Sequence, residues 1–398
     1  MKPATSQVAA PTPSDPPRLH SRRTVISQGV LAMGGLALAR LQAVSAAAQA
    51  TGLAAAWKKH FRIGVAVSNQ ALEGRADEQL RLIAREFDQV TPENAMKWGV
   101  IQPDGVHWQW ERADRLVDFA HQNHLDVLGH NLVWHSQVPA SLFVDADRRP
   151  LSRAALLARM REHIQTLVGR YQGRVWAWDV VNEAIDEDKG WRRSPWFNII
   201  GDDFMEQAFR FAHAVDPQAR LLYNDYNMHN PAKRAFLVDV LKGYQERGVP
   251  INGVGLQTHI GLDYPDLGEW ERSVATYAGM GLTVHVTELD IDVLPTPADT
   301  GADVANRAAY SQQNDPYRDG LPAEVQQKLA DRYEQLFRIL LRYPGSVQRV
   351  TFWGLHDGIS WKNNFPVPGR TNYPLLFDRQ MKAKPAYDRL MKLARGKD

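Results

Sequence analysis

Short apolar segments alternate with longer amphipathic ones from about residue 60 to the C-terminus. The apolar segments are rich in β-branched residues, as expected for parallel strands that are buried on both faces. They predict strands at Ile63–Val67, Phe87–Thr91, Asp126–His130, Val175–Val181, Arg220–Asn224, Gly253–Gln257, Thr283–Thr287 and Arg349–Trp353. The amphipathic segments have the period of helices. They predict helices at Asp77–Glu86, Ala113–Asn123, Arg153–Tyr171, Asp203–Val215, Pro231–Arg247, Leu267–Met280, Ala323–Tyr343 and after Pro385.

This alternation predicts the α/β class and a (β/α)8 TIM barrel, in which eight strands alternate with eight helices. A doubly wound open sheet is the alternative, but Ser68–Leu72 stands where the glycine-rich phosphate turn of such folds would open the first helix. No linker rich in Pro, Gly or Ser interrupts residues 60–395, so residues 51–398 are expected to form a single catalytic domain. The longest stretch without periodicity, Leu294–Pro322, is expected to be an elaborated loop after the seventh strand.

Residues 1–50 have the pattern of a signal peptide that is removed on export. Arg22 and Arg23 precede an apolar run at Val30–Ala39, and small residues follow at Ala46–Ala50. The apolar run is too short to span a bilayer. The paired arginines favour the twin-arginine route, with a Sec signal as the alternative. Either way, the mature chain is expected in the periplasm or as a secreted protein.

Charge and cysteine content exclude several classes of function. The leader contains five of the 47 basic residues and one of the 45 acidic residues, so the mature chain has 42 basic and 44 acidic residues and a net charge of −2. That balance indicates no nucleic-acid partner and, once the leader is removed, no membrane partner. The chain has no cysteine, which excludes disulfides and thiolate chemistry. We expect a monomer.

Two predicted strands each deliver a glutamate. Val175–Glu183 ends in Asn182 and Glu183, and Leu282–Asp290 delivers Glu288 at the end of its strand. A buried carboxylate is costly to desolvate unless it has a task or a partner, so this repeat suggests two acids that face one bond. The glutamates are 105 positions apart, or three βα units, which places them on strands four and seven, nearly across the barrel mouth. Neighbours in a regular strand point to opposite faces, so we predict a departure from regular strand geometry at residues 181–183.

Polar and aromatic residues also follow most of the other predicted strands. In a barrel these strand ends meet at one rim, which is where such enzymes place their active sites. Tryptophan, amide, histidine and lysine side chains together are typical of a carbohydrate groove. The candidates beside the glutamates are Glu93, Asn94, Lys97, His130, Trp134, Tyr226, Gln257, His259, Asp290, Trp353 and Trp361.

Two of these segments have a specific resemblance. Trp178–Glu183 and Thr287–Asp290 resemble the acid/base and nucleophile motifs of family 10 glycoside hydrolases, which are retaining endo-1,4-β-xylanases with a (β/α)8 barrel. The resemblance extends from about Phe61 to the C-terminus and includes Trp361–Asp378. It implies that Glu183 is the general acid/base and Glu288 the nucleophile.

The resemblance also implies roles for the other candidates. Asn182 would hold the 2-hydroxyl of the sugar in subsite −1, and His259 would contact the nucleophile with Asp290 as its partner. Tyr226 would stack on the aglycone side. The glycone subsites would be lined by Glu93, Asn94, Lys97, His130, Trp134, Gln257, Trp353 and Trp361.

The expected chemistry needs two carboxyl groups, roughly 5–5.5 Å apart in a retaining enzyme, with Glu183 protonated and Glu288 ionised. No cofactor is implied, and the sequence lacks His-Glu-x-x-His and sulfur ligands, so we expect no catalytic metal. Two alternatives remain: a retaining β-1,4-glucanase or cellobiohydrolase-like barrel, and a non-catalytic sugar-binding barrel. Trp176 and Trp178 lie within a strand and are interpreted as packing residues.

Overall fold

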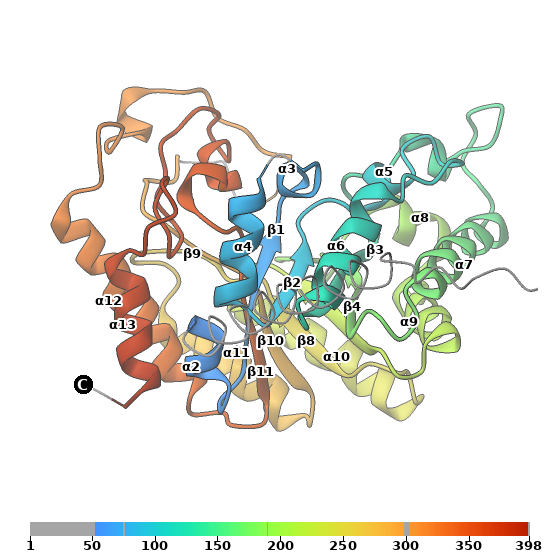
Figure 1. The fold of residues 1–398 in the computed structure, drawn as a ribbon. Coiled ribbons are helices and arrows are strands. Elements are labelled where there is room, and N and C mark those ends of the chain that lie inside the picture. Colours follow the sequence, from blue (N-terminus) through green and yellow to red (C-terminus); the bar gives the residue numbers. More distant parts are fainter. Residues whose placement is uncertain (1–51, 75, 189, 298–302, 304, 397–398) are drawn as a thin grey trace, which may run out of the picture. The chain divides into compact units, whose positions relative to one another are not determined.

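The computed structural model describes residues 52–396, except 75, 189, 298–302 and 304 (Figure 1). The predicted signal peptide, residues 1–50, lies outside these described residues. No helix within them is both long and apolar enough to cross a membrane.

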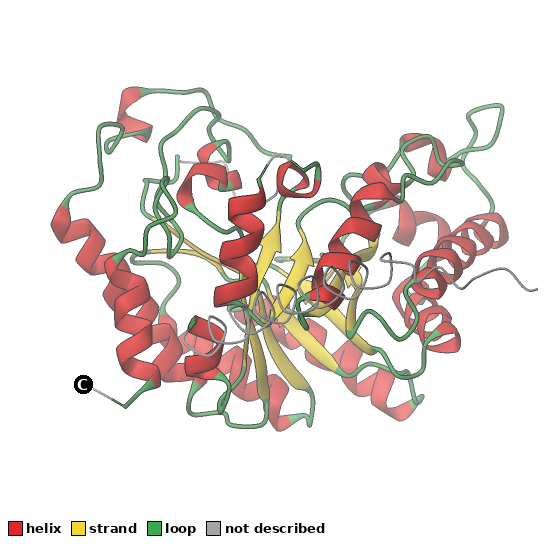
Figure 2. Ribbon diagram, in the orientation of Figure 1, coloured by secondary structure: helices red, strands yellow, loops and turns green. Residues whose placement is uncertain are grey.

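Eight parallel strands form a closed barrel, as predicted. Their order is β1-β2-β3-β4-β7-β8-β10-β11, and β11 pairs with β1 to close the ring. Figure 2 shows these strands surrounded by helices. The barrel strands are β1 Arg62–Val67, β2 Gln89–Pro92, β3 Asp126–Trp134, β4 Ala177–Asn182, β7 Arg220–Asp225, β8 Gly253–Leu256, β10 Thr283–Asp292 and β11 Val347–Phe352.

A long helix follows each barrel strand, within a few residues of its predicted bounds. These helices are α4 Asp77–Glu86, α6 Glu111–Gln122, α7 Arg153–Arg170, α9 Phe204–Val215, α10 Pro231–Glu246, α11 Leu267–Gly279, α12 Ala323–Leu340 and α13 Pro385–Ala394. Their starts follow the local sequence. Asn230 caps α10 by accepting hydrogen bonds from the backbone of Ala232 and Lys233, with Pro231 in the first helical position. Asp266 caps α11 through the backbone N–H of Glu269.

Smaller elements, which the sequence pattern did not predict, decorate the loops. The short helices are α2 Leu53–Trp57, α3 Asn69–Leu72, α5 Trp98–Ile101 and α8 Pro195–Ile200, and the 3-10 turns are η1 Ala140–Phe143, η2 Gln312–Asn314, η3 Asp357–Ile359 and η4 Trp361–Asn363. The additional strands are β5 Ile185–Asp186, β6 Gly190–Trp191 and β9 His259–Gly261. Strands β5 and β6 form an antiparallel hairpin directly after Glu183.

The seventh barrel strand differs from its prediction. Strand β10 continues to Asp292, so Glu288 lies within the strand rather than at its end. The extension forms because β9 pairs with residues 290–292 after the pairing with β8 has ended at Val286. The register with β11 also shifts between Val286 and Leu289. Glu288 therefore lies at an irregularity of the ladder, where a bulge can redirect a side chain.

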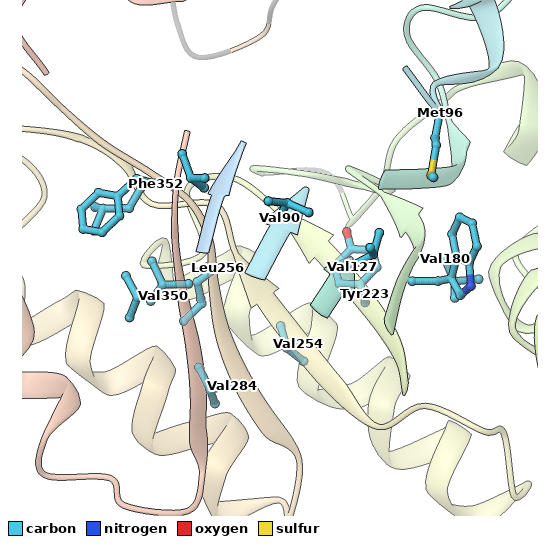
Figure 3. Packing of buried hydrophobic residues seen from close by; sticks show 14 of the residues in the cluster. Val90, Met96, Val127, Val180, Tyr223, Val254, Leu256, Val284, Val350 and Phe352 are labelled. Atoms are coloured by element: carbon cyan, nitrogen blue, oxygen red, sulfur yellow. The ribbon is translucent and has the colours of Figure 1, made fainter. Parts of the chain in front are cut away.

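Apolar side chains from the barrel strands pack together in the interior. Figure 3 shows Val90, Val127, Val254 and Val284 among them, and all four are buried. Trp178 is fully buried, as its interpretation as a packing residue required. Its indole ring lies so close to Gly129 that a Cβ on that glycine would come within 2.1 Å of a ring carbon.

We expect Gly129→Ala to destabilise the protein by about 1–3 kcal/mol, because strand and ring are both confined by the barrel. Gly279→Ala is the matched control, since a Cβ there meets no atom within 4 Å at the end of α11. Denaturant unfolding of both variants tests this expectation. Equal stability of the two proteins would show that the contact between Gly129 and Trp178 is not tight.

Candidate active site

A groove of about 1060 Å³ opens among residues that follow the barrel strands. Every predicted site residue lines it except Asp290, which lies behind His259. Both Glu183 and Glu288 are buried, at 5% exposure each. Seven of the barrel strands and the loops after them thus bring together side chains that are scattered over most of the sequence.

Glu183 sits where regular strand geometry stops. Strand β4 ends at Asn182, and its register with β7 shifts between Asp179 and Val181. Glu183 itself has a φ of 56°, the left-handed region that a residue with a Cβ seldom adopts. The predicted irregularity at 181–183 is therefore confirmed. Such a conformation costs on the order of 1 kcal/mol or more and persists only where surrounding contacts hold it.

Three side-chain donors hold the Glu183 carboxyl group. Trp134 Nε1 donates to Oε2 at 2.9 Å, while Gln257 Nε2 and Asn182 Nδ2 donate to Oε1 at 2.9 and 3.1 Å. Burial nevertheless raises the pKa of Glu183, and the negative charge of Glu288 raises it further, against the lowering effect of the hydrogen bonds from Gln257 and Trp134. The environment therefore favours a proton on Glu183.

Glu288 has different neighbours. Its Oε1 accepts a hydrogen bond from Asn224 Nδ2 at 2.7 Å, and its Oε2 lies 3.2 Å from His259 Nε2. On the other side of the imidazole, His259 Nδ1 lies 3.0 Å from Asp290 Oδ1. An amide donor and an imidazole ring thus face the two oxygens of Glu288 and hold the carboxyl group in place.

His259 is a cation in this arrangement. Burial alone would lower the pKa of its imidazole, but Asp290 and Glu288 outweigh that effect and raise the pKa to about 9. Asp290 in turn has a lowered pKa, because His259 and Lys362 offset the cost of burying its charge. Trp361 Nε1 donates to the other oxygen of Asp290 at 2.7 Å and so fixes this carboxylate.

Amide groups connect the two glutamates. Asn224 Nδ2 donates both to Glu288 and to Asn182 Oδ1, the latter at 2.9 Å, and Asn182 donates to Glu183. Gln257 Nε2 adds contacts to Asn182 and Glu183. Thr287 Oγ1 donates to Asn224 Oδ1 at 2.6 Å, which sets the orientation of that amide. Sequence reasoning did not select Asn224, although it occupies a strand end in the same way as Asn182.

A cationic and amide-rich cluster lines another part of the groove. Lys97 Nζ donates to Asn94 Oδ1 at 3.0 Å and lies 4.9 Å from the centre of the Trp134 ring. Burial lowers the pKa of Lys97 and raises the pKa of Glu93, while their opposite charges partly offset both shifts. Donors and acceptors of this kind suit sugar hydroxyl groups.

His130 is neutral. Burial lowers its pKa to about 3, and its Nδ1 lies 2.9 Å from Asp179 Oδ2. A proton on Nδ1 satisfies that contact and leaves Nε2 as an acceptor. The ring packs edge-on against Trp353, with centroids 5.2 Å apart. Trp361 stacks on Phe365 with centroids 4.7 Å apart, so both tryptophans are fixed in the groove wall.

Two tyrosines, Tyr226 and Tyr264, also line the groove. Tyr226 lies over Lys233, whose Nζ is 4.1 Å from the ring centre, and its hydroxyl accepts a hydrogen bond from Arg192 at 2.7 Å. Tyr264 is 55% exposed, lines the groove and contacts His229 through its hydroxyl at 2.7 Å. Neither Arg192 nor Tyr264 was selected from sequence, because both belong to loops whose course no periodicity predicts.

Comparisons with known proteins agree with this geometry. The family model described as glycosyl hydrolase family 10 matches residues 52–393. Endo-1,4-beta-xylanase A of Xylanibacter ruminicola is 41% identical over 336 residues, which are 84% of this chain and 91% of that protein. An endo-1,4-beta-xylanase of Geobacillus stearothermophilus is 40% identical over 338 residues, covering 84% of this chain and 96% of that protein. The solved structure of a GH10 endoxylanase from a sugarcane soil metagenome matches with a TM-score of 0.82 and 48% identity, covering 86% of this chain and 99% of that chain.

We expect Asp290→Asn to lower the pKa of His259 from about 9 toward its ordinary value, because one of two carboxylates is lost while burial remains. A raised pKa in the folded state stabilises the protein below the unfolded pKa of about 6.5. That stability is lost as the pH rises through about 9, and the variant should lack it.

NMR titration of the imidazole measures this pKa, with the His259 signal identified from a His259→Asn spectrum. His229, whose pKa burial lowers to about 4, is the internal control and should not move. A His259 pKa that stayed near 9 in the variant would show that Asp290 is not its main source.

Proposed function

This chain belongs to glycosyl hydrolase family 10, and we propose that it is an endo-1,4-β-xylanase that cleaves internal β-1,4-xylosidic bonds of xylan with retention of configuration. The main support for this proposal is a pair of buried glutamates in one groove. Amide side chains connect the two carboxyl groups, and each glutamate has different hydrogen-bonding neighbours. The substrate is inferred from membership in the family. The two different catalytic roles are inferred from the different neighbours of the two glutamates.

Glu183 is assigned as the general acid/base. Burial raises its pKa and so favours the protonated form, and that proton passes to the departing glycosidic oxygen in the first step. In the second step the ionised Glu183 takes a proton from water as that water attacks the anomeric carbon, and the bond to Glu288 breaks to release its carboxylate. The donors on both carboxyl oxygens support the ionised form during that step.

Glu288 is assigned as the nucleophile. Its carboxylate attacks the anomeric carbon as the bond to the leaving oxygen breaks, and a glycosyl-enzyme forms. His259, which Asp290 holds in place, faces Oε2 of Glu288, and Asn224 donates to Oε1. These contacts orient the nucleophile and are released in part as its charge is consumed.

Substrate binding is assigned to the remaining groove residues. Asn182 is placed to meet the 2-hydroxyl of the reacting sugar, and Tyr226 to stack against the leaving sugar. The glycone side is assigned to Glu93, Asn94, Lys97, His130, Trp134, Gln257, Trp353 and Trp361. The groove volume of about 1060 Å³ leaves room for several sugars, which supports attack within a chain.

We also infer that the chain is exported as a periplasmic or secreted protein and acts as a monomer. The twin-arginine pattern of residues 1–50 supports export, and every assigned group comes from one chain.

Replacement of Arg22 and Arg23 by lysine should block export of the full chain, as measured by activity outside the cytoplasm. Unchanged export would exclude the twin-arginine route, and size-exclusion chromatography tests the monomer.

The most informative experiment is product analysis by NMR. We expect rapid hydrolysis of xylan with internal cleavage, and the β-anomer as the first product from xylo-oligosaccharides, because two displacements restore the configuration. Carboxymethyl cellulose is the comparison substrate, and a preference for it would favour a glucanase instead. A first-formed α-anomer would contradict the double displacement.

Glu288→Ala should reduce kcat by about 10³-fold or more, because an alanine side chain cannot form the glycosyl-enzyme. Glu183→Ala should reduce kcat/KM on xylan by about 10²–10⁴-fold. Azide should restore turnover of activated aryl xylosides in both variants, giving the α-glycosyl azide with Glu288→Ala and the β-glycosyl azide with Glu183→Ala. Exposed Glu324, in the first turn of α12, supplies the control Glu324→Ala. If each variant gave the other azide anomer, Glu183 would be the nucleophile and Glu288 the acid/base.

A further inference from the structure

Arg192 links three segments that are distant in the sequence. Its Nε donates to the backbone carbonyl of Glu183 at 3.0 Å, and its Nη2 donates to the Tyr226 hydroxyl at 2.7 Å. The third nitrogen, Nη1, lies 2.9 Å from Asp303 Oδ2 in the long connection after β10. All three nitrogens of the planar guanidinium group therefore make a contact, which fixes its position better than any single contact would.

The Arg192 side chain is itself held firmly. It follows β6, and its backbone N–H donates to Ala184 O at 2.8 Å, so the β5–β6 hairpin returns it to the residue after Glu183. The side chain is only 14% exposed. Burial lowers its pKa, but Tyr226, Asp225 and Glu183 outweigh burial and hold the pKa above its ordinary value. Arg192 is thus a fixed cation.

Two of the residues that Arg192 contacts, Glu183 and Tyr226, line the groove. Glu183 has the unfavourable φ of 56°, and its backbone is held by Asn224 O on one side and Arg192 on the other. The ring of Tyr226 rests on Lys233, but the hydroxyl end is fixed by Arg192. One side chain therefore connects the backbone of Glu183 to the hydroxyl group of Tyr226.

We propose that Arg192 is a positioning residue that holds Glu183 and Tyr226 at one spacing, so that a sugar stacked on Tyr226 presents its glycosidic oxygen to the proton of Glu183. This rests on the proposed function. Arg192 is not among the residues that line the groove, so it acts through the two residues it holds. Arg192 should therefore contribute to the rate only for substrates whose leaving group is a sugar that needs a proton.

Two substrates separate this role from a general structural one. Xylotetraose has a sugar leaving group that needs both protonation and stacking, whereas 2,4-dinitrophenyl β-xylobioside has an acidic phenol that needs neither. We expect Arg192→Ala to lower kcat/KM about 10²-fold on xylotetraose, the scale of a small misplacement of a catalytic group. On the dinitrophenyl substrate the loss should stay below about threefold, because kcat/KM reports only the glycosylation step.

Arg192→Lys should recover only part of the loss, because an ammonium cannot donate in three fixed directions. The matched control is Arg193→Ala, since Arg193 is exposed and its guanidinium lies over Phe197, away from Glu183. It should behave as the unchanged protein on both substrates. If Arg192→Ala does not fold, Tyr226→Phe removes only the hydroxyl contact and should show the same selectivity to a smaller extent.

Equal losses on the two substrates, or no loss on xylotetraose, would overturn the positioning role. Failure of the proposed function is recognised separately, because the unchanged protein would then not cleave xylotetraose at all. Circular dichroism and thermal unfolding of each variant accompany the kinetics. A loss confined to xylotetraose in a folded Arg192→Ala variant supports the proposal.

Discussion

The site depends on the burial of two carboxyl groups within one hydrogen-bonded network. Glu183 and Glu288 are each 5% exposed, and bringing like charges out of water is unfavourable unless one group keeps a proton and the other is well solvated by the protein. Asn224 meets that constraint by donating to Glu288 and to Asn182, which donates to Glu183. The network surrounds Glu183 and Glu288 with different neighbours, so one site can contain both an acid and a nucleophile.

Irregular strand geometry delivers these groups to the network. A regular β4 would turn Asn182 and Glu183 to opposite faces, but the register shift before Val181 and the φ of 56° at Glu183 let both reach the groove. In β10 the shift after Val286 has the same effect for Glu288, and the two-residue period then places Asp290 beside His259. The closed barrel holds these deviations in place because each strand is paired on both sides.

Periodicity predicted the barrel because buried parallel strands and amphipathic helices leave strong patterns, and α4 has the predicted bounds. The motif around Glu183 and the strand of Glu288 predicted the site, because strand ends meet at one rim. Sequence placed Glu288 at the end of its strand, yet β10 runs on to Asp292, since pairing with β9 depends on a neighbour that no local pattern reveals. Asn224 and Arg192 were missed for a similar reason: their importance comes from tertiary contacts, not from local composition.

If Glu288 is the nucleophile of a covalent double displacement, the glycosyl-enzyme intermediate can be trapped on its side chain. A 2-deoxy-2-fluoro xylobioside with a dinitrophenyl leaving group forms the glycosyl-enzyme quickly and releases it slowly. Peptide mass spectrometry of the inactivated protein should then find one fluoroxylobiosyl group on the peptide that contains Glu288, and xylobiose should protect against its attachment. A label on another carboxylate, or turnover without any trapped species, would show that Glu288 is not the nucleophile.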